Sequence, residues 1–313
     1  ATQSTAEAWC AGPWMCWYPF CGKNIPMDLS FHAPTPLQYF ASLVQSDDHF
    51  PLLEAVASLA QDEYPELDVE QVLGDVDQLL ARLQRRLPAD AGPLQRLRLL
   101  NQFFFVDLGF GGNVNDYYDP DNSYLQAVLR TRRGIPISLA VLWMELAQGL
   151  RLKAHGVGFP GHFMVKVQLP KGQVVIDPFT GHSLSREALS ERLEPFQPRQ
   201  LHGALADDAD VPLGLYLQTA APRDIVARML RNLKEIHRSQ QDWGRLIAVQ
   251  DRLIVLLPES WAEYRDRGQA YATQGHTAQA LTDLETYLHH AAFEALDIGT
   301  IADQVDALRR KGD

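Results

Sequence analysis

"TRRGIPISLAVLWMELA", residues 131–147, has the pattern of a helix start. Gly134 forms a turn, and Pro136 occupies the first helical position, where its missing N–H has no intrahelical partner to lose. An apolar run then continues for several turns through Leu139 and Leu142. Because a helix N-terminus lowers the pKa of a nearby thiol and favours developing negative charge, such a start is suited to carry a nucleophile.

Composition places the chain among globular proteins. The 313 residues are 46% hydrophobic and 21% charged, which leaves room for about two domains. A formal charge of −11 with scattered basic residues argues against a nucleic-acid surface. The short basic stretch at Arg130, Arg132 and Arg133 is interpreted as a solvated helix end, with anion binding as the alternative.

No run of about eighteen apolar residues is present, so we expect no transmembrane helix. We also expect no cofactor, no metal, no nucleic-acid partner and no membrane partner. The predicted location is cytoplasmic, because no stretch reads as a targeting segment and the core has no thiols to pair.

The three cysteines, Cys10, Cys16 and Cys21, all lie in a Trp-rich segment. This segment precedes Met27, the first methionine that reads like a native translation start. Their spacing contains no CxxC and is a poor zinc site. The segment also lacks the basic region and unbroken apolar core of a signal peptide. We therefore predict that residues 1–26 are foreign to the fold, a fused segment or upstream translation. The alternative is a functional Cys/Trp-rich peptide carried by the rest of the chain.

Helical patterns dominate the next part of the sequence. Periodicity predicts helices over 36–64, over 68–87 with Asp68 as its cap, and from Pro93 to Gly109.

The stretch 111–125 is dense in Asn, Asp, Gly and Pro, and we interpret it as a loop built by turn chemistry. An EF-hand reading from Asp119 fails, because Tyr124 and Arg130 stand where the calcium loop needs Gly and Glu.

After the helix at 136–150 the hydrophobic period changes from about 3.6 to 2. The pattern predicts a hairpin, with strands at 162–169 and 174–178 and a turn at 170–173. Helices followed by antiparallel strands indicate an α+β fold.

His162 begins the first predicted strand and Asp177 lies near the end of the second. Across a hairpin the two side chains can meet, with the carboxylate fixing the tautomer of the imidazole as in Cys/Ser–His–Asp sites.

The order of these parts resembles the transglutaminase core, a papain-like fold. It is similar above all to a bacterial family of transglutaminase-like proteins with a tetratricopeptide tail, often labelled invasion regulators. The motifs that carry the resemblance are "GN..DYYDP.NSYL", "R.GIPI.L", "GVGFPGHF" and "DPF.G", and the match spans roughly residues 35–295. It implies a helical region plus core at 27–195, a linker at 196–222 and helical repeats at 223–313.

The resemblance also implies that His162 and Asp177 are two-thirds of a catalytic triad. When the family's helix is aligned with this one, its nucleophilic Cys falls on Pro136, so this chain has no thiol at that position. Ser138 is the candidate substitute, or else a polar first-turn residue that satisfies the helix end. His162 is correspondingly either a retained binding or catalytic imidazole or a histidine kept for packing. A zinc site of His162 with His155 and His182 matches no metal signature.

The C-terminal third carries two stretches at the roughly 34-residue tetratricopeptide period. In the second, from Trp261, the consensus places are filled by Tyr264, Gly268, Tyr271, Ala280 and Leu284.

The first stretch, from Ala227, is degenerate, with Lys234 where a small residue belongs and Pro258 closing it. Two repeats rarely stand alone, so we expect them to pack against the core or to pair with a partner. We predict a protein- or peptide-binding module, with Tyr264 and Tyr271 as partner-binding residues.

Three hypotheses on function follow. The first is a non-catalytic transglutaminase-like scaffold whose repeats recruit a protein or peptide. The second is a hydrolase of amide or ester bonds that uses Ser138, His162 and Asp177. The third is a carrier for the functional N-terminal peptide.

Overall fold

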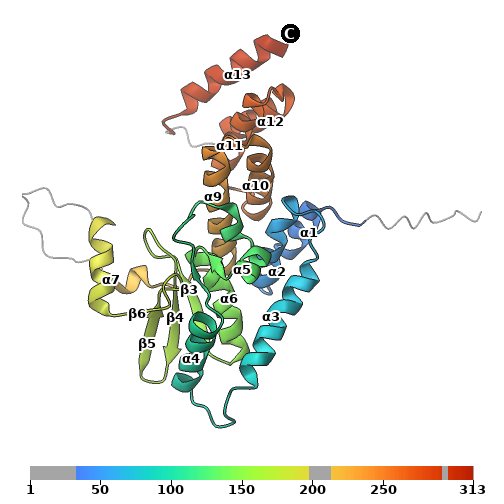
Figure 1. Ribbon diagram of the computed structural model, residues 1–313. Helices are drawn as coiled ribbons and strands as arrows, with labels where there is room; N and C mark the ends of the chain where they lie inside the picture. Colours follow the sequence, from blue (N-terminus) through green and yellow to red (C-terminus); the bar gives the residue numbers. More distant parts are fainter. Residues whose placement is uncertain (1–32, 197–212, 291–294, 313) are drawn as a thin grey trace, which may run out of the picture. The chain divides into compact units, whose positions relative to one another are not determined.

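The computed structural model describes residues 33–196, 213–290 and 295–312, and its fold is α+β as predicted (Figure 1). It contains a four-stranded antiparallel sheet, a short parallel ladder and many helices. The segment predicted to be foreign, 1–26, and most of the predicted linker lie outside the described residues. No helix within the described ranges is long and apolar enough to cross a bilayer.

Helical elements lead up to the first strand. They are α1 (Pro36–Leu43), α2 (Leu52–Ala57), the 3₁₀ helix η1 (Ser58–Asp62), α3 (Val69–Gln84), α4 (Pro93–Asn101) and the π-helical turn η2 (Gln102–Asp107). The single helix expected over 36–64 is therefore wrong. Helix α1 ends at Leu43, and α2 begins only after Pro51. A proline disfavours helical geometry in the residue before it, so the helix does not continue through this position. Asp68 caps α3 as expected by accepting a hydrogen bond from the backbone N–H of Gln71 at 3.2 Å.

The centre of the fold is α6 (Pro136–Gly149), which is buried on almost every side. A helix that is apolar all round belongs in a protein interior, and α6 contacts both the sheet and the surrounding helices. Its Trp143 is fully buried and donates its indole N–H to Asn101 at 3.1 Å. The preceding elements are β1 (Gly111–Gly112), η3 (Pro120–Ser123), α5 (Leu125–Thr131) and β2 (Arg133–Gly134).

The main sheet has the order β3-β4-β5-β6, and every neighbouring pair is antiparallel. Its strands are β3 (Lys153–Val157), β4 (Met164–Leu169), β5 (Gly172–Ile176) and β6 (Ser183–Leu184). The predicted hairpin exists, but β4 begins two residues later than expected, at Met164, and its turn is shorter. Register explains the shorter turn, because Leu169 pairs with Gly172 and leaves only two residues between the strands. β3 and β6 were not predicted.

After β6 the chain continues into α7 (Arg186–Leu193), η4 (Glu194–Phe196) and, beyond a gap in the described residues, α8 (Leu213–Tyr216). Leu189, Leu193 and Leu217 form a small second core with residues of the sheet.

The repeats comprise α9 (Pro222–Ser239), α10 (Trp243–Leu256), α11 (Trp261–Thr273), α12 (Thr277–His290) and α13 (Ile298–Gly312). Gly268 faces α12 with no room for a side chain, since a Cβ there would lie 2.8 Å from the side chain of Leu284. The small residue of the tetratricopeptide consensus therefore has its usual role in the second repeat.

The first repeat packs against the core, which is one of the two alternatives that the sequence left open. Side chains of α9 and α10, among them Met229 and Leu253, belong to the same hydrophobic cluster as α6. Arg252 is 1% exposed and donates to Asp62 at 2.6 Å, and Arg245 pairs with Glu63. These contacts tie α10 to the end of η1.

Gly112 is covered by an aromatic ring. A Cβ at this position would lie 2.1 Å from the ring of Phe179, whereas at Gly111 the nearest atom would be 3.8 Å away. We expect Gly112→Ala to lower the free energy of unfolding by about 1–3 kcal/mol, because the ring has to move. Gly111→Ala is the matched control and should change it little. Urea unfolding of both variants checks this, and equal effects would contradict the packing described.

His237 of α9 is 2% exposed, and neither ring nitrogen has a hydrogen-bond partner among the described residues. Burial lowers its pKa; Arg245 acts in the same direction, while Asp242 and Glu63 oppose it. The neutral form is thus favoured in the folded state. Stability contributed by the neutral ring is fully present above the unfolded pKa of about 6.5 and is lost as the pH falls below it.

We therefore expect the free energy of unfolding to fall as the pH drops below about 6.5, with a slope of at most about 1.4 kcal/mol per pH unit from this group. His237→Leu should flatten that part of the profile, and the exposed His276→Leu is the control. Urea unfolding at several pH values tests this. Parallel profiles for the wild type and His237→Leu would show that the ring does not titrate as described.

Candidate functional site

The N-terminus of α6 is built by three short segments that meet there. Ile135 has extended backbone geometry as the N-cap, and Pro136 follows as the first helical residue. The ladder of β1 and β2 runs beside this start, with Asn113 donating its N–H to the carbonyl of Gly134 at 3.1 Å.

Ser138 lies in the first turn of α6 and is fully buried. Its Oγ is 2.6 Å from the carbonyl oxygen of Asn122 and 3.1 Å from that of Ile135. A hydroxyl has one proton to donate, and here two backbone carbonyls accept it. Among the hydrogen bonds of the described residues, none joins Ser138 to His162. A nucleophilic role for Ser138 stays a prediction.

His162 and Asp177 are brought together as the sequence predicted. His162 lies in the turn before β4, and Asp177 lies just after β5. The Nε2 atom of His162 is 2.8 Å from the Oδ1 atom of Asp177. Gly161 supplies that turn with a left-handed φ of 67°. The side chain of Asp177 is 2% exposed and that of His162 is 22% exposed, so the imidazole reaches the surface while its carboxylate does not.

Two further groups hold Asp177. The backbone N–H of Phe179 donates to Oδ1 at 2.9 Å, and Arg192 of α7 donates to Oδ2 at 3.2 Å. Burial by itself raises the pKa of Asp177, and the contact with His162 lowers it. With Phe179 and Arg192 added, the pKa of this carboxyl lies below its ordinary value. Asp177 is therefore ionised near neutral pH and can orient the imidazole.

Asn122 connects the loop to the start of α6. Its side chain accepts from Asn113 at 3.0 Å and donates to the carbonyls of Asp116 and Tyr117 at 2.7 and 3.2 Å. Its own carbonyl accepts from the N–H of Ile135 at 3.2 Å, besides the Ser138 hydroxyl. One residue thus fixes both the loop and the helix start.

Phe179 joins the same cluster from the other side. Its carbonyl accepts the N–H of Gly112 at 2.9 Å, and its ring centroid lies 6.1 Å from that of Tyr117. The backbone of Phe179 also contacts Asp177, so the "DPF" and "GGN" stretches are parts of one site.

Asn122, Phe179 and Arg192 were missed by the sequence analysis. The first two stand inside the quoted motifs, and the density of polar residues at 111–125 was correctly assigned to turn chemistry. Nothing local in the sequence marks Arg192, because it reaches Asp177 from a separate helix.

The acidic residues of the loop have structural partners. Asp119 caps η3 by accepting from the N–H of Asp121 at 3.0 Å, and Asp121 accepts the hydroxyl proton of Tyr64. Within the described part of the chain, no group of three or more His, Cys, Asp or Glu side chains is placed to hold a metal ion. This includes the set of His155, His162 and His182.

Tyr264 and Tyr271, the predicted partner-binding residues, both lie beside Arg267. The guanidinium carbon of Arg267 is 5.8 Å from each ring centroid, and its nitrogens donate to Asp251 and Asp283 at 2.6 to 2.7 Å. Burial raises the pKa of Tyr271. A role of the two tyrosines in partner binding stays a prediction.

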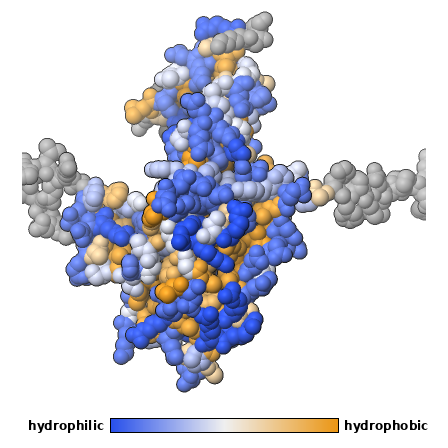
Figure 2. Space-filling model, viewed as in Figure 1, coloured by the Kyte–Doolittle hydropathy of each residue, from blue (hydrophilic) through white to orange (hydrophobic). Residues whose placement is uncertain are grey.

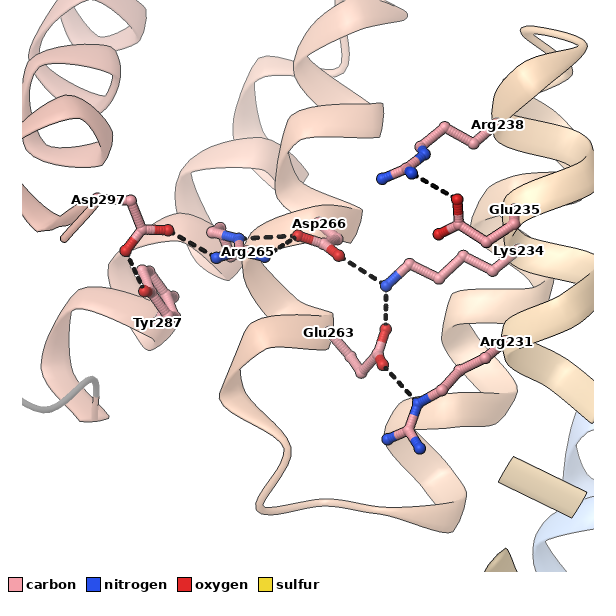
Figure 3. Close-up of polar contacts among 9 residues, drawn as sticks. All are labelled: Arg231, Lys234, Glu235, Arg238, Glu263, Arg265, Asp266, Tyr287 and Asp297. Carbon is pink, nitrogen blue, oxygen red and sulfur yellow. Dashed lines mark hydrogen bonds and ion pairs between the residues drawn. The ribbon is translucent and has the colours of Figure 1, made fainter. Parts of the chain in front are cut away.

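Lys234, which departs from the consensus, is the centre of an ion-pair network (Figure 3). Its ammonium group donates to Glu263 and, at 2.6 Å, to Asp266, both on α11. The side chains of Lys234 and Glu263 are 8% and 6% exposed. The lysine therefore bridges the two repeats, and a buried charge of this kind is stable only because both carboxylates pair with it.

The network continues along α11 and beyond (Figure 3). Arg265 donates to Asp266 at 2.8 Å and to Asp297 at 2.6 Å, and Asp297 also accepts the hydroxyl proton of Tyr287 at 2.6 Å.

Removal of the Asn122 side chain tests how the site is held. Asn122→Ala leaves Asn113 and two backbone carbonyls without their partner, and we expect it to lower the free energy of unfolding by about 1–3 kcal/mol. Backbone amides at 113–119 should also exchange hydrogen faster. The exposed Asn115→Ala in the same loop is the control and should do neither. Unfolding in urea and hydrogen exchange measure both effects, and unchanged exchange after Asn122→Ala would refute this account of the loop.

Comparison with known proteins agrees with the fold. The transglutaminase-like superfamily matches residues 70–231, and the tetratricopeptide repeat family matches residues 233–310. A UPF0162 protein of Xylella fastidiosa strain Temecula1 is 38% identical over 243 residues, which is 77% of this chain and 84% of the relative.

More distant relatives carry the same name. A UPF0162 protein of Pseudomonas aeruginosa strain PAO1 is 30% identical over 70% of this chain and 77% of its own length. One from Vibrio cholerae is 25% identical over 78% of this chain and 87% of its own. No solved structure matches the chain significantly. The chain belongs to the transglutaminase-like superfamily and, within it, to the bacterial UPF0162 proteins.

Proposed function

We propose that this protein is a non-catalytic member of its superfamily that binds a protein or peptide through its tetratricopeptide repeats. The observation that supports it most is at the start of α6. Pro136 stands where the resemblance places the nucleophilic Cys, and the hydroxyl of Ser138 is directed to two backbone carbonyls. A serine needs its base within about 3 Å to act as a nucleophile.

The repeats supply the binding surface in this proposal. Tetratricopeptide helices form concave surfaces that take extended peptides or helices. The face of the repeats seen in Figure 2 is mostly hydrophilic, which favours recognition by hydrogen bonds and charge over apolar docking. A regulatory role in the cytoplasm, of the invasion-regulator type, is part of the same proposal, and the carrier role of the N-terminal segment stays a prediction.

One observation favours a hydrolase as the second candidate. The His162–Asp177 pair is assembled at 2.8 Å, with the imidazole partly exposed, as a general base would be.

Assays of ester and amide hydrolysis and of amine transfer to glutamine amides separate the two candidates. We expect wild type, Ser138→Ala and His162→Ala to be indistinguishable from buffer. Ser138→Ala should cost about 1 kcal/mol of stability, because the carbonyl of Asn122 loses one of its two donors and keeps the N–H of Ile135. Activity that is present in the wild type and lost in a folded Ser138→Ala variant would establish the hydrolase instead.

A photo-crosslinking amino acid tests binding through the repeats. Placed at the exposed Ala262 of α11, in bacterial cells, it should give a discrete adduct that mass spectrometry identifies. The same residue at the exposed Gln173 of β5 is the control and should not give it. The adduct should survive His162→Ala. An adduct formed only at Gln173, or abolished by His162→Ala, would shift the binding function to the core.

A further inference from the structure

Three arginines lie over two phenylalanine rings at the ends of α3 and α5. Arg82 and Arg86 lie over Phe103, with their guanidinium carbons 5.8 and 4.9 Å from the ring centroid. Arg132, the residue that follows the last turn of α5, lies 4.6 Å from the centroid of Phe110. We call Arg82, Arg86 and Arg132 the arginine patch.

The charges of the arginine patch are close enough to repel one another. Phe110 stacks on Phe104 at a centroid distance of 4.3 Å, and Phe104 directly follows the phenylalanine under Arg82. The helices α3 and α5 are also in contact. Burial and the charge of Arg82 both lower the pKa of Arg132, while Asp75 acts in the opposite direction.

Most of the arginine patch has no carboxylate partner within the protein. The chain holds 39 acidic and 28 basic residues, so carboxylates are in excess, and Arg267 in the repeats pairs with two of them. In the patch, Arg86 pairs with Asp107. Among the ion pairs of the described residues, none includes Arg82 or Arg132.

Stabilisation of the helix ends accounts for only part of this arrangement. A cation in the last turn interacts favourably with the helix dipole, and Arg82 in α3 and Arg130 in α5 hold such positions. Arg132 adds a second cation to the end of α5, at a left-handed φ of 61° where Gly or Asn is usual. It is also half-buried and repelled by Arg82. The end of α5 therefore does not require this second arginine, whereas an anion-binding site does.

Guanidinium groups that lie over rings are well placed to bind a carboxylate. The ring covers one face of the guanidinium, while the N–H groups at its edge can donate to a ligand. A carboxylate accepts such donors in pairs, and its charge offsets the repulsion between Arg82 and Arg132. A cation would add to that repulsion, and a neutral group would leave it unchanged.

The surroundings favour a carboxylate over a phosphate. Phosphate groups bind readily to the free N–H groups of a helix N-terminus, whereas α3 and α5 both end here and present carbonyls. A nucleic acid or an anionic membrane would also meet Asp75 and Asp107 beside the patch and a net charge of −11. A short segment with one or two carboxylates avoids both of these costs.

We propose that the arginine patch binds an Asp or Glu side chain in an acidic segment of a partner protein. The patch belongs to the core and not to the repeats, so it is a second interaction surface that goes beyond the proposed function. For Arg132, the proposal selects anion binding over the solvated helix end as the interpretation of the basic stretch.

The probe is N-acetyl-tetraglutamate amide, titrated into the ¹⁵N-labelled full chain. The Nε–H signals of Arg82 and Arg132, assigned with Arg82→Gln and Arg132→Gln, report on the patch. We expect a saturable shift that weakens with added salt, and binding at least fivefold tighter than for tetraglutamine, inorganic phosphate or a dT tetranucleotide. Equal or tighter binding of phosphate or the nucleotide would overturn the proposal in favour of a phosphate site. Equal binding of tetraglutamine would show that the charge is not recognised.

Arg82→Gln and Arg132→Gln should each weaken binding of tetraglutamate at least fivefold, read from the signal of the other arginine. Arg186→Gln removes the same charge at an exposed position of α7 and is the matched control, which should bind like the wild type. Urea unfolding checks that the variants are folded. An equal loss in all three variants would reduce the effect to net charge. Binding that survives both patch variants, or no shift with any probe, would leave only stabilisation of the helix ends. Each of these results overturns the proposal.

The two proposals fail separately. If tetraglutamate does not bind while the Ala262 adduct still forms, the arginine patch is overturned as a binding surface and the scaffold function stands. If tetraglutamate binds selectively but no adduct forms, the patch is supported and binding through the repeats is overturned.

Discussion

The placement of the α6 N-terminus depends on Asn122, which is buried between the loop and the helix. Its side chain closes the loop on itself, and its carbonyl receives Ile135 N–H and Ser138 Oγ. The four sequence motifs of the family therefore describe one structural cluster, although they are far apart in the chain. The residues of these motifs contact one another. Their structural role is therefore sufficient to account for the motifs, without a catalytic role.

The His162–Asp177 pair fits the same view. Asp177 satisfies the imidazole, the N–H of Phe179 and Arg192 at once, so it joins the turn after β5 to α7. Losing this carboxylate would leave three donors without an acceptor. The pair thus forms a structural connection between the sheet and the following helix, while its partly exposed imidazole keeps a polar group on the surface.

Much of the fold could be predicted from the sequence, because its signals are local. Caps and prolines marked the starts of α3, α4 and α6, and alternation marked β4 and β5. The predicted hairpin and the family motifs indicated the contact between His162 and Asp177. What could not be predicted depends on distant partners: the sheet neighbour that makes β3 a strand, the arginine that reaches Asp177 from α7, and the two carboxylates on α11 that make Lys234 a bridge.

α9 belongs to both parts of the molecule. The superfamily match ends at residue 231 and the repeat match begins at 233, in the middle of this helix. Its apolar side chains are buried in the central cluster, while Lys234 joins it to α11. A cut between the matched segments would divide one continuous helix and expose its apolar stripe to water. Because the helix and its packing are shared, we expect the core and the first repeat to unfold together, unlike domains that are joined only by a linker.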